Sequence, residues 1–429
     1  MQIRHKTRFI YFFLTSLLFL SLNNQQYFSP FILTPQESNP GIQTYISALA
    51  NLLRSDLNYL QPKHLDYQLN FEEFPSHWTN IFFLLFTPIV KLFGLNYFMG
   101  RLFAILLNLI GMYLIINFFK NTRNISILFF PILFFTPAFK IGLSFLYVDS
   151  LFLLLIGLFL YVYKFYGWKN KITYIYILFS GITIHYSVIF FFIFILINIF
   201  FDQKKLLNEK IKNCLIFSAS YFIIFFLILL IILLINPDYA YLIEKIKIRF
   251  SVPGDEIFFT FNISENTLLR RLYLFYVHVR DNFGLFAFII MIFEFFILLK
   301  KKDFILVYFS SVILLFIVLS KYTISHNFLS LQFIFVSYLV LINFFKNIQT
   351  KKYFLACLIL FLINFIFINH DKSLYLIDSK LQSGYLTYLS VKNLTSKEDE
   401  LLKYNQDMYL RVYPIYYKLE SKKFFYFKN

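Results

Sequence analysis

A series of apolar runs separated by short basic clusters is the feature that most constrains this sequence. Each run is long enough to cross a lipid bilayer, in some cases only with its flanks. Hydrophobic residues make up 59% of the 429 residues and charged residues only 15%, too little polar surface for a water-soluble protein. The sequence therefore predicts an all-α polytopic membrane protein, a bundle of about 11 transmembrane helices. The runs lie near residues 9–22, 98–119, 124–142, 147–163, 172–186, 187–201, 213–236, 284–299, 304–320, 327–345 and 353–369.

The basic residues predict which side of the membrane each loop faces. If the N-terminus is cytoplasmic, every dense basic cluster falls on the cytoplasmic side, as the positive-inside rule requires. The net charge of +17 therefore indicates orientation in a membrane and gives no reason to expect nucleic acid as a partner. The clusters are Arg4/Lys6/Arg8, Lys120/Arg123, Lys164/Lys169/Lys171, Lys204/Lys205/Lys210/Lys212, Lys300/Lys301/Lys302 and Lys346/Lys351/Lys352.

Two segments decide the helix count. Residues 81–94 are apolar but short and contain Pro88 and Lys91, which predicts a helix lying along the membrane interface. Residues 172–201 could form one long helix, but Gly181 and the polar pair His185-Tyr186 predict two helices that meet at the outer face. Any other count places basic clusters beyond these segments on the outer side.

With this topology, residues 1–369 form a transmembrane domain and residues 370–429 an outward-facing C-terminal segment, a small cap. The first outer loop spans residues 23–97, with helical-looking sequence at 42–54, and a large outer loop spans residues 237–283.

Neither cleavage nor cross-linking is expected. The first apolar run is followed by Asn23-Asn-Gln-Gln26 in place of small residues, which predicts an uncleaved first helix. The two cysteines, Cys214 and Cys357, lie inside apolar runs, so the sequence predicts no disulfide framework and no cysteine metal site.

Short motifs recur at the predicted outer ends of the helices. In chain order they are Gln36-Glu37, Phe71-Glu-Glu-Phe74, Gly100-Arg101, Phe134-Phe-Thr-Pro-Ala-Phe-Lys140 and Leu146-Tyr-Val-Asp149. In their order and sidedness they resemble the GT-C superfamily of membrane glycosyltransferases, especially the branch of protein mannosyltransferases and the lipid A aminoarabinose transferase. The resemblance runs from the N-terminus to about residue 200 and more loosely to residue 345.

The resemblance implies two catalytic carboxylates. In the family one acid lies in the first outer loop and another where the fourth helix begins, which by position are Glu37 and Asp149. The family usually has two adjacent acids at the first site, whereas this chain has Gln36-Glu37, so the role falls either to Glu37 or to Asp66, Glu72 or Glu73; Glu73 is also a candidate substrate-binding residue. Transfer from a lipid phosphate to a hydroxyl needs a carboxylate, either to take the acceptor proton or to hold a divalent cation.

Cationic side chains are the candidates for binding the donor phosphate, because a phosphate at the membrane boundary needs charged hydrogen-bond donors. They are Arg101, Lys140, His185 and His326. The resemblance implies a basic residue after the fifth helix and another at the start of a late helix, and His185 and His326 stand there. The alternatives are interfacial hydrogen bonds for the histidines and snorkelling to headgroups for Arg101 and Lys140.

The resemblance implies a glycosyltransferase that moves a sugar from a polyprenyl-phosphate donor to a lipid, glycan or protein acceptor. Its site would face the periplasm or lumen, in a bacterial inner membrane or the endoplasmic reticulum membrane. A transporter or flippase of lipid-linked saccharides is the alternative; transporters generally show internal repeats and polar groups at the midplane. A noncatalytic membrane scaffold would need neither the acidic first loop nor Asp149.

Overall fold

The computed structural model describes residues 5–22, 35–54, 60–65, 71–72, 79–94, 96–202, 205–235, 275–276, 279–280, 282–301, 303–318, 327–348, 355 and 358–359. Glu73, His326, most of the large outer loop and the C-terminal segment therefore lie outside the described residues, as does the side chain of Glu37.

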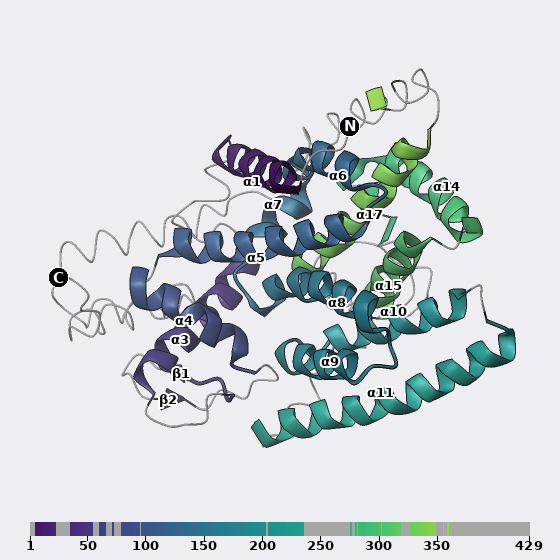
Figure 1. The fold of residues 1–429 in the computed structure, drawn as a ribbon. Helices are drawn as coiled ribbons and strands as arrows, with labels where there is room; N and C mark the ends of the chain where they lie inside the picture. Colours follow the sequence, from purple (N-terminus) through teal and green to yellow (C-terminus); the bar gives the residue numbers. More distant parts are fainter. Residues whose placement is uncertain are drawn as a thin grey trace, which may run out of the picture.

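The described part is almost entirely helical (Figure 1). A pair of two-residue strands, antiparallel with His64 opposite Glu72, lies beside the helix of residues 35–53. The elements are α1 His5–Leu22, α3 Pro35–Leu53, β1 His64–Leu65, β2 Phe71–Glu72, α4 Ile81–Phe93, α5 Tyr97–Phe118, α6 Arg123–Phe129, η1 Phe130–Phe135, α7 Pro137–Ser144, η2 Val148–Leu151, α8 Phe152–Tyr166, α9 Lys171–Thr183, α10 Ser187–Phe201, α11 Leu207–Ile235, α14 Leu285–Lys301, α15 Phe304–Val318 and α17 Asn327–Asn347.

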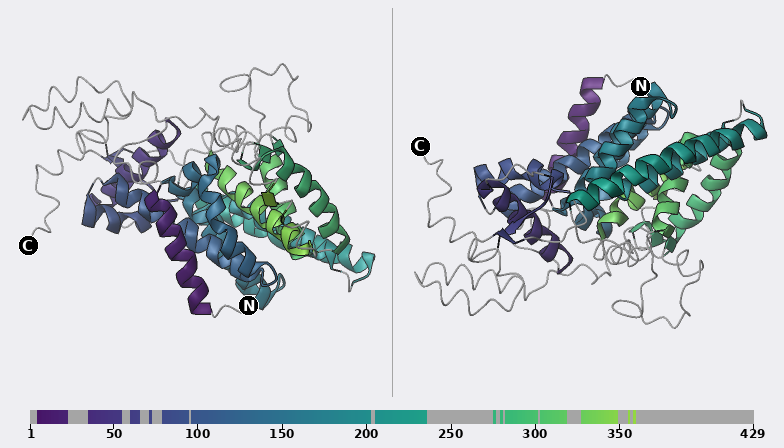
Figure 2. Two further views of the ribbon diagram at one scale, coloured as in Figure 1. Left: turned by 90° about the horizontal axis from the view of Figure 1, so that it is seen from above. Right: turned by 90° about the horizontal axis from the view of Figure 1, so that it is seen from below.

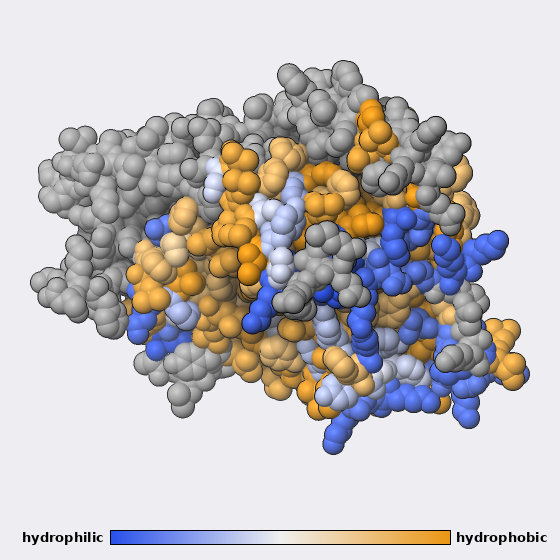
Figure 3. Space-filling view, turned by 45° about the horizontal axis from the view of Figure 1, so that its top comes forward, coloured by the Kyte–Doolittle hydropathy of each residue, from blue (hydrophilic) through white to orange (hydrophobic). Residues whose placement is uncertain are grey.

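Three described helical segments are long and apolar enough to cross a membrane: Phe98–Phe118, Val148–Tyr166 and Leu207–Ile235. The last of these, α11, runs across one face of the molecule (Figure 2). It buries one stripe that includes Phe217, Tyr221 and Ile228, while Phe226 and Leu234 are 66% and 75% exposed. A helix that is apolar on its exposed face as well as its buried face is suited to lipid rather than water. Hydrophobic side chains also cover much of the face in Figure 3, with hydrophilic ones gathered on its right-hand side.

Helices α5 and α8 pack against each other in parallel. A β-carbon added at Gly111 of α5 would lie 2.4 Å from the carbonyl carbon of Leu153, and one added at Gly157 of α8 would lie 2.9 Å from Cβ of Leu114. One turn further on, the rings of Phe118 and Tyr161 meet edge to face at 5.8 Å. The residue numbers of the contact pairs increase together along both helices, which is why the helices are parallel. The chain between the end of α5 and the start of α8 must therefore run back along their length.

The returning segment departs from the single helix predicted over residues 124–142. It consists of α6, the 3₁₀ helix η1 and α7. Pro131 and Pro137 stand at the starts of η1 and α7, and a proline ring removes a backbone donor and clashes with the preceding turn of a continuous helix. Three short helices therefore replace the predicted one.

The predicted division of residues 172–201 is confirmed. Helix α9 ends at Thr183 and α10 begins at Ser187. Helix α10 runs parallel to α8, because Phe152 contacts Tyr186 at 5.0 Å and Phe159 contacts Phe191 at 4.2 Å between ring centroids. Helix α9 connects the end of α8 to the start of α10, so the chain reverses at residues 184–186, beside the start of α8.

The segment predicted as the first outer loop contains two helices that pack on each other, α3 and α4. Helix α4 buries Phe82, Phe86 and Val90 and exposes Leu85 and Leu92; its position along a membrane interface stays a prediction. Helix α3 begins at Pro35, earlier than the predicted residue 42, because proline is well tolerated in a first helical turn.

Replacing Gly111 with alanine should lower stability by about 1–3 kcal/mol, since the new methyl group would overlap the backbone of α8. Thermal unfolding of the purified protein in a neutral detergent would measure the loss. Ile110→Leu, at the exposed neighbouring position, is the matched control and should be close to neutral. Equal melting temperatures for Gly111→Ala and Ile110→Leu would contradict the close approach of the two helices.

Candidate functional site

Asp149 is a buried acid at the start of a membrane-length helix. It lies in η2, directly before α8, and is 5% exposed. The hydroxyl of Tyr186 donates a hydrogen bond to its Oδ1. Tyr186 itself is 1% exposed and belongs to the reversal between α9 and α10. The acid is therefore bound to a second part of the chain and is no solvated surface carboxylate.

The local backbone explains why Asp149 is held in this place. Tyr147 is extended, and the chain turns into η2 immediately after it. The backbone N–H and the hydroxyl of Ser150 both donate to the carbonyl of Tyr147, the N–H at 3.0 Å. The carboxylate thus stands in the first turn of a helical segment, where the helix dipole favours a negative charge. The predicted position of Asp149 at a helix start is confirmed.

Helix α3 docks on the segment that precedes Asp149. Tyr147 donates through its hydroxyl to Oε1 of Gln43 at 3.3 Å, and Thr44 Oγ1 donates to the carbonyl of Leu146 at 3.2 Å. Glu37 lies six residues before Gln43 in the same helix, about 9 Å along its axis. Glu37 belongs to the segment predicted as the first outer loop, and its backbone lies in the first turn of α3, before the predicted helical stretch 42–54. That Glu37 faces Asp149 stays a prediction.

Arg101 lies at the same end of the molecule. It is 3% exposed and follows Gly100, where an added β-carbon would lie 2.6 Å from the hydroxyl of Tyr45 and 2.7 Å from Cδ2 of Leu146. Arg101 therefore sits beside the contact between α3 and the segment leading to Asp149. Its burial inside the protein argues against the alternative of snorkelling to lipid headgroups.

His185 also lies at this end, next to Tyr186 in the α9–α10 reversal. It is half-buried, and its ring meets that of Tyr186 edge to face at 5.8 Å. Lys140 has its backbone in α7, but its side chain lies outside the description, and so do all of Glu73 and His326. The structure thus brings Asp149, Arg101 and His185 to one end, and leaves the positions of the other candidates as predictions.

Polar contacts missed by the sequence reasoning hold this end together. Thr79, just before α4, donates to the carbonyl of Ile182 at 2.8 Å. The amides of Asn51 and Asn80 bond to each other at 2.7 and 3.1 Å, and Arg54 donates to Oδ1 of Asn51 at 3.3 Å. These bonds join α3, the start of α4 and the end of α9. The only sequence signal was the polar break at His185-Tyr186, which predicted the turn and not its partners.

Glu294 forms a separate polar cluster. It is fully buried in α14 and accepts hydrogen bonds on Oε1 from Asn343 at 2.6 Å and Asn347 at 3.2 Å, both in α17. Interhelical hydrogen bonds of this kind stabilise helix pairs in membranes. Among the residues that the structure describes, no group of three or more His, Cys, Asp or Glu side chains could hold a metal ion.

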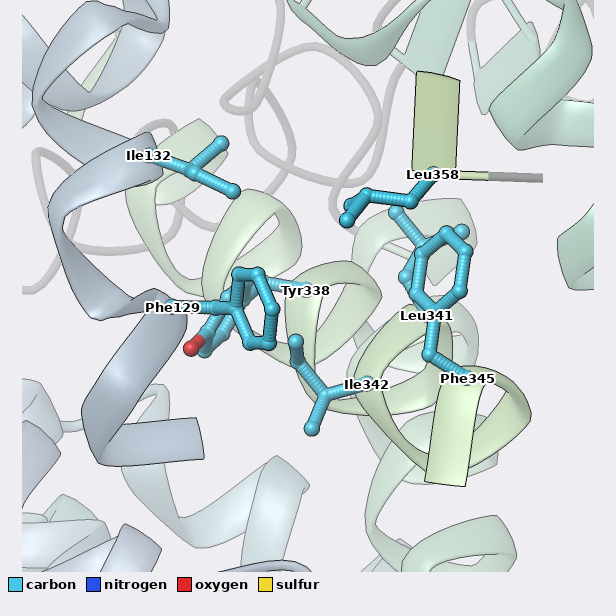
Figure 4. Close-up of a pocket in the computed structure, with 7 residues that line it drawn as sticks. All are labelled: Phe129, Ile132, Tyr338, Leu341, Ile342, Phe345 and Leu358. Atoms are coloured by element: carbon cyan, nitrogen blue, oxygen red, sulfur yellow. The ribbon is translucent and has the colours of Figure 1, made fainter. Parts of the chain in front are cut away.

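An apolar cleft lies elsewhere, between the α6–η1 segment and α17 (Figure 4). Its single polar lining group, the Tyr338 hydroxyl, donates to the carbonyl of Ser126. The cleft therefore offers contact to an apolar chain but no group for chemistry. It is lined by Phe129, Ile132, Tyr338, Leu341, Ile342, Phe345 and Leu358.

Comparison of the chain with protein-family models, with curated proteins and with solved structures found no match.

The bond between Tyr186 and Asp149 can be measured by a double-mutant cycle of Tyr186→Phe and Asp149→Ala. A hydrogen bond to a charged group contributes about 1.5–3 kcal/mol, so the double variant should lose less stability than the sum of the two single losses, by a similar amount. Unfolding in mixed detergent micelles gives the free energies. Tyr147→Phe paired with Asp149→Ala is the control, since Tyr147 bonds to Gln43. Additive losses for Tyr186→Phe would show that the bond is absent.

Proposed function

We propose that this chain is a membrane glycosyltransferase of the GT-C type, which moves a sugar from a polyprenyl-phosphate donor to a lipid, glycan or protein acceptor. The observation that carries this proposal is the buried Asp149 at the start of α8, bound to Tyr186 and accompanied at the same end by Arg101 and His185. A carboxylate and cations from separate elements are what transfer from a phosphate requires.

The proposed chemistry assigns a task to each group. A carboxylate, Glu37 or Asp149, takes the proton of the acceptor hydroxyl as its oxygen attacks the anomeric carbon. The bond between that carbon and the phosphate oxygen breaks, and the polyprenyl phosphate leaves with the electron pair. Arg101, with Lys140, His185 and His326, would stabilise the charge of the leaving phosphate.

The proposed topology has a cytoplasmic N-terminus, about 11 spans and the site on the periplasmic or lumenal side. Two observations support it. The parallel packing of α5 and α8 requires a returning segment between them, and the reversal at residues 184–186 turns the chain back at the end where Asp149 lies. This arrangement supports alternate crossings of one bilayer, and the proposed membrane is a bacterial inner membrane or that of the endoplasmic reticulum.

A transporter or flippase of lipid-linked saccharides is the second candidate. Glu294 favours it, because an ionisable side chain buried within an apolar bundle is often part of a transport pathway. The two asparagines that bond to Glu294 give it a structural role instead, and the acid, cations and docked α3 at the other end favour transfer.

Removing either candidate carboxylate should abolish sugar transfer. Glu37→Gln and Asp149→Asn keep the side-chain shape and lose the base, so turnover should fall by about 10²-fold or more. Membranes containing each variant would be incubated with a panel of radiolabelled polyprenyl-phosphate sugars, and label in lipid, glycan and protein fractions counted.

The matched control for both variants is Glu209→Gln, which removes an exposed acid at the opposite end. Folding would be checked by thermal unfolding of each purified variant. Near-normal transfer by Glu37→Gln would exclude Glu37 and leave Glu72 and Glu73 as the next candidates. Near-normal transfer by both variants would contradict the enzyme proposal and favour a flippase.

Cysteine accessibility tests the proposed orientation. In a variant lacking Cys214 and Cys357, a cysteine at Lys91 should react with an impermeant maleimide on sealed right-side-out vesicles. A cysteine at Lys120 should react only after permeabilisation, because α5 lies between the two exposed positions. The opposite pattern would reverse the orientation, and labelling of both from outside would mean that α5 does not cross.

A further inference from the structure

Arg8 and Arg123 lie at the end of the molecule opposite Asp149. In the described part of the chain, both have buried N–H groups without a hydrogen-bond acceptor. Arg8 of α1 is only 8% exposed, and within the described part of the chain its Nε and Nη1 have no hydrogen-bond partner. Arg123, the first residue of α6, is half-buried, and its Nε is likewise buried without a partner there. A buried charged group is costly unless it is paired and hydrogen-bonded.

The two guanidinium groups are held near each other by the packing of α1. This helix packs on α6 and η1, with the rings of Phe12 and Phe130 at 4.4 Å, and Phe9 meets Tyr113 of α5 at 5.3 Å. Burial lowers the pKa of Arg123, and the positive charge of Arg8 lowers it further. The fold thus holds two like charges close together.

No carboxylate is available on the neighbouring elements to neutralise them. The sequences of α1, α5, α6, η1, α7 and α8 contain no Asp or Glu, and neither do the loops that follow α5 and α8. The described acids at this end lie on other elements: Asp202 pairs with Lys205 at 3.0 Å, Asp303 accepts from the backbone N–H of Ile305 at 2.9 Å, and Glu209 is exposed. Cations at this end include the exposed Lys120 and Lys164, and Nζ of Lys164 lies 5.5 Å from the centroid of the Phe118 ring. The described chain therefore supplies no anion to neutralise the two arginines.

We propose that Arg8 and Arg123 form a binding site for a phosphate group, at the end of the bundle opposite Asp149. A phosphate has several anionic oxygens, which match the planar donor forks of two arginines better than a single carboxylate does. Its source is either the headgroup of an anionic phospholipid, whose charge attracts basic segments at a membrane surface, or free inorganic phosphate.

This site is distinct from the donor site proposed above. Tyr113, which adjoins Arg123, lies twelve residues after Arg101 in α5, about 18 Å along the helix axis. Binding at the arginine pair therefore does not depend on glycosyl transfer, and its test needs no activity.

The test is thermal unfolding of the delipidated full chain. The wild type would be compared in nanodiscs of phosphatidylcholine alone and of phosphatidylcholine with phosphatidic acid, and in neutral detergent with sodium phosphate or sodium chloride at equal ionic strength. Phosphatidic acid should raise the melting temperature by about 5 °C. A rise with sodium phosphate as well means that free phosphate suffices, and a rise with phosphatidic acid alone assigns the site to the lipid headgroup.

Variants separate binding from structural packing. Arg8→Met and Arg123→Gln should lose the phosphate-dependent rise. In neutral detergent with chloride they should melt at or above the wild-type temperature, because an unpaired buried charge and a like-charge repulsion are removed. Lys120→Gln removes the same charge from an exposed position nearby and should keep most of the rise.

Either of two results would overturn the proposal. The first is a wild-type melting temperature that neither phosphatidic acid nor phosphate raises. The second is a rise that survives in both arginine variants. A variant that melts lower than the wild type by the same amount in every condition would show a structural role for that arginine and would also count against the site.

Discussion

The close parallel contact between α5 and α8 is the interaction on which the rest of the structure depends. Gly111 and Gly157 allow the two backbones to approach more closely than a residue with a side chain would permit. Small residues at helix interfaces allow such close approach in membrane proteins. Because the helices are parallel, their first turns lie at one end, so Arg101 near the start of α5 and Asp149 before α8 reach the same region. An antiparallel pair would place them at opposite ends.

The parallel contact also determines what the chain between the two helices must do. It has to return within residues 119–147, and the prolines divide this return into α6, η1 and α7. The return leaves Arg123 at one end and delivers the extended Tyr147 at the other, where α3 binds it through Gln43. Helix α10 then repeats the direction of α8 and brings Tyr186 to Asp149. The parallel packing of α5 with α8, and of α8 with α10, thus positions each element at the candidate site.

Features governed by local sequence could be predicted, and features governed by tertiary contacts could not. Hydrophobic runs and the polar pair His185-Tyr186 predicted the division between α9 and α10, and the apolar run after Asp149 predicted a helix start. The bond from Tyr186 to Asp149 joins residues 37 positions apart, and no periodicity indicates such a partner. The burial of Arg8 was also missed, since an arginine in an N-terminal basic cluster is typical of a solvated loop.

Charged groups inside the described part of the chain show how the same physical cost is met in different ways. Glu294 accepts on Oε1 from the amides of two asparagines of one neighbouring helix, which ties α14 to α17, while its Oε2 is buried without a hydrogen-bond partner in the described part of the chain. Arg8 and Arg123 have no acid on any neighbouring element, so the compensating charge must come from outside the described chain. Asp149 is bonded by a tyrosine of a turn and stands beside a helix from an outer loop. In the proposed topology this end lies at an aqueous boundary, where loops can admit an acceptor and a lipid phosphate together, whereas a helix interior cannot. The position of Asp149, more than its burial, is therefore what supports the proposed reaction at this end of the molecule.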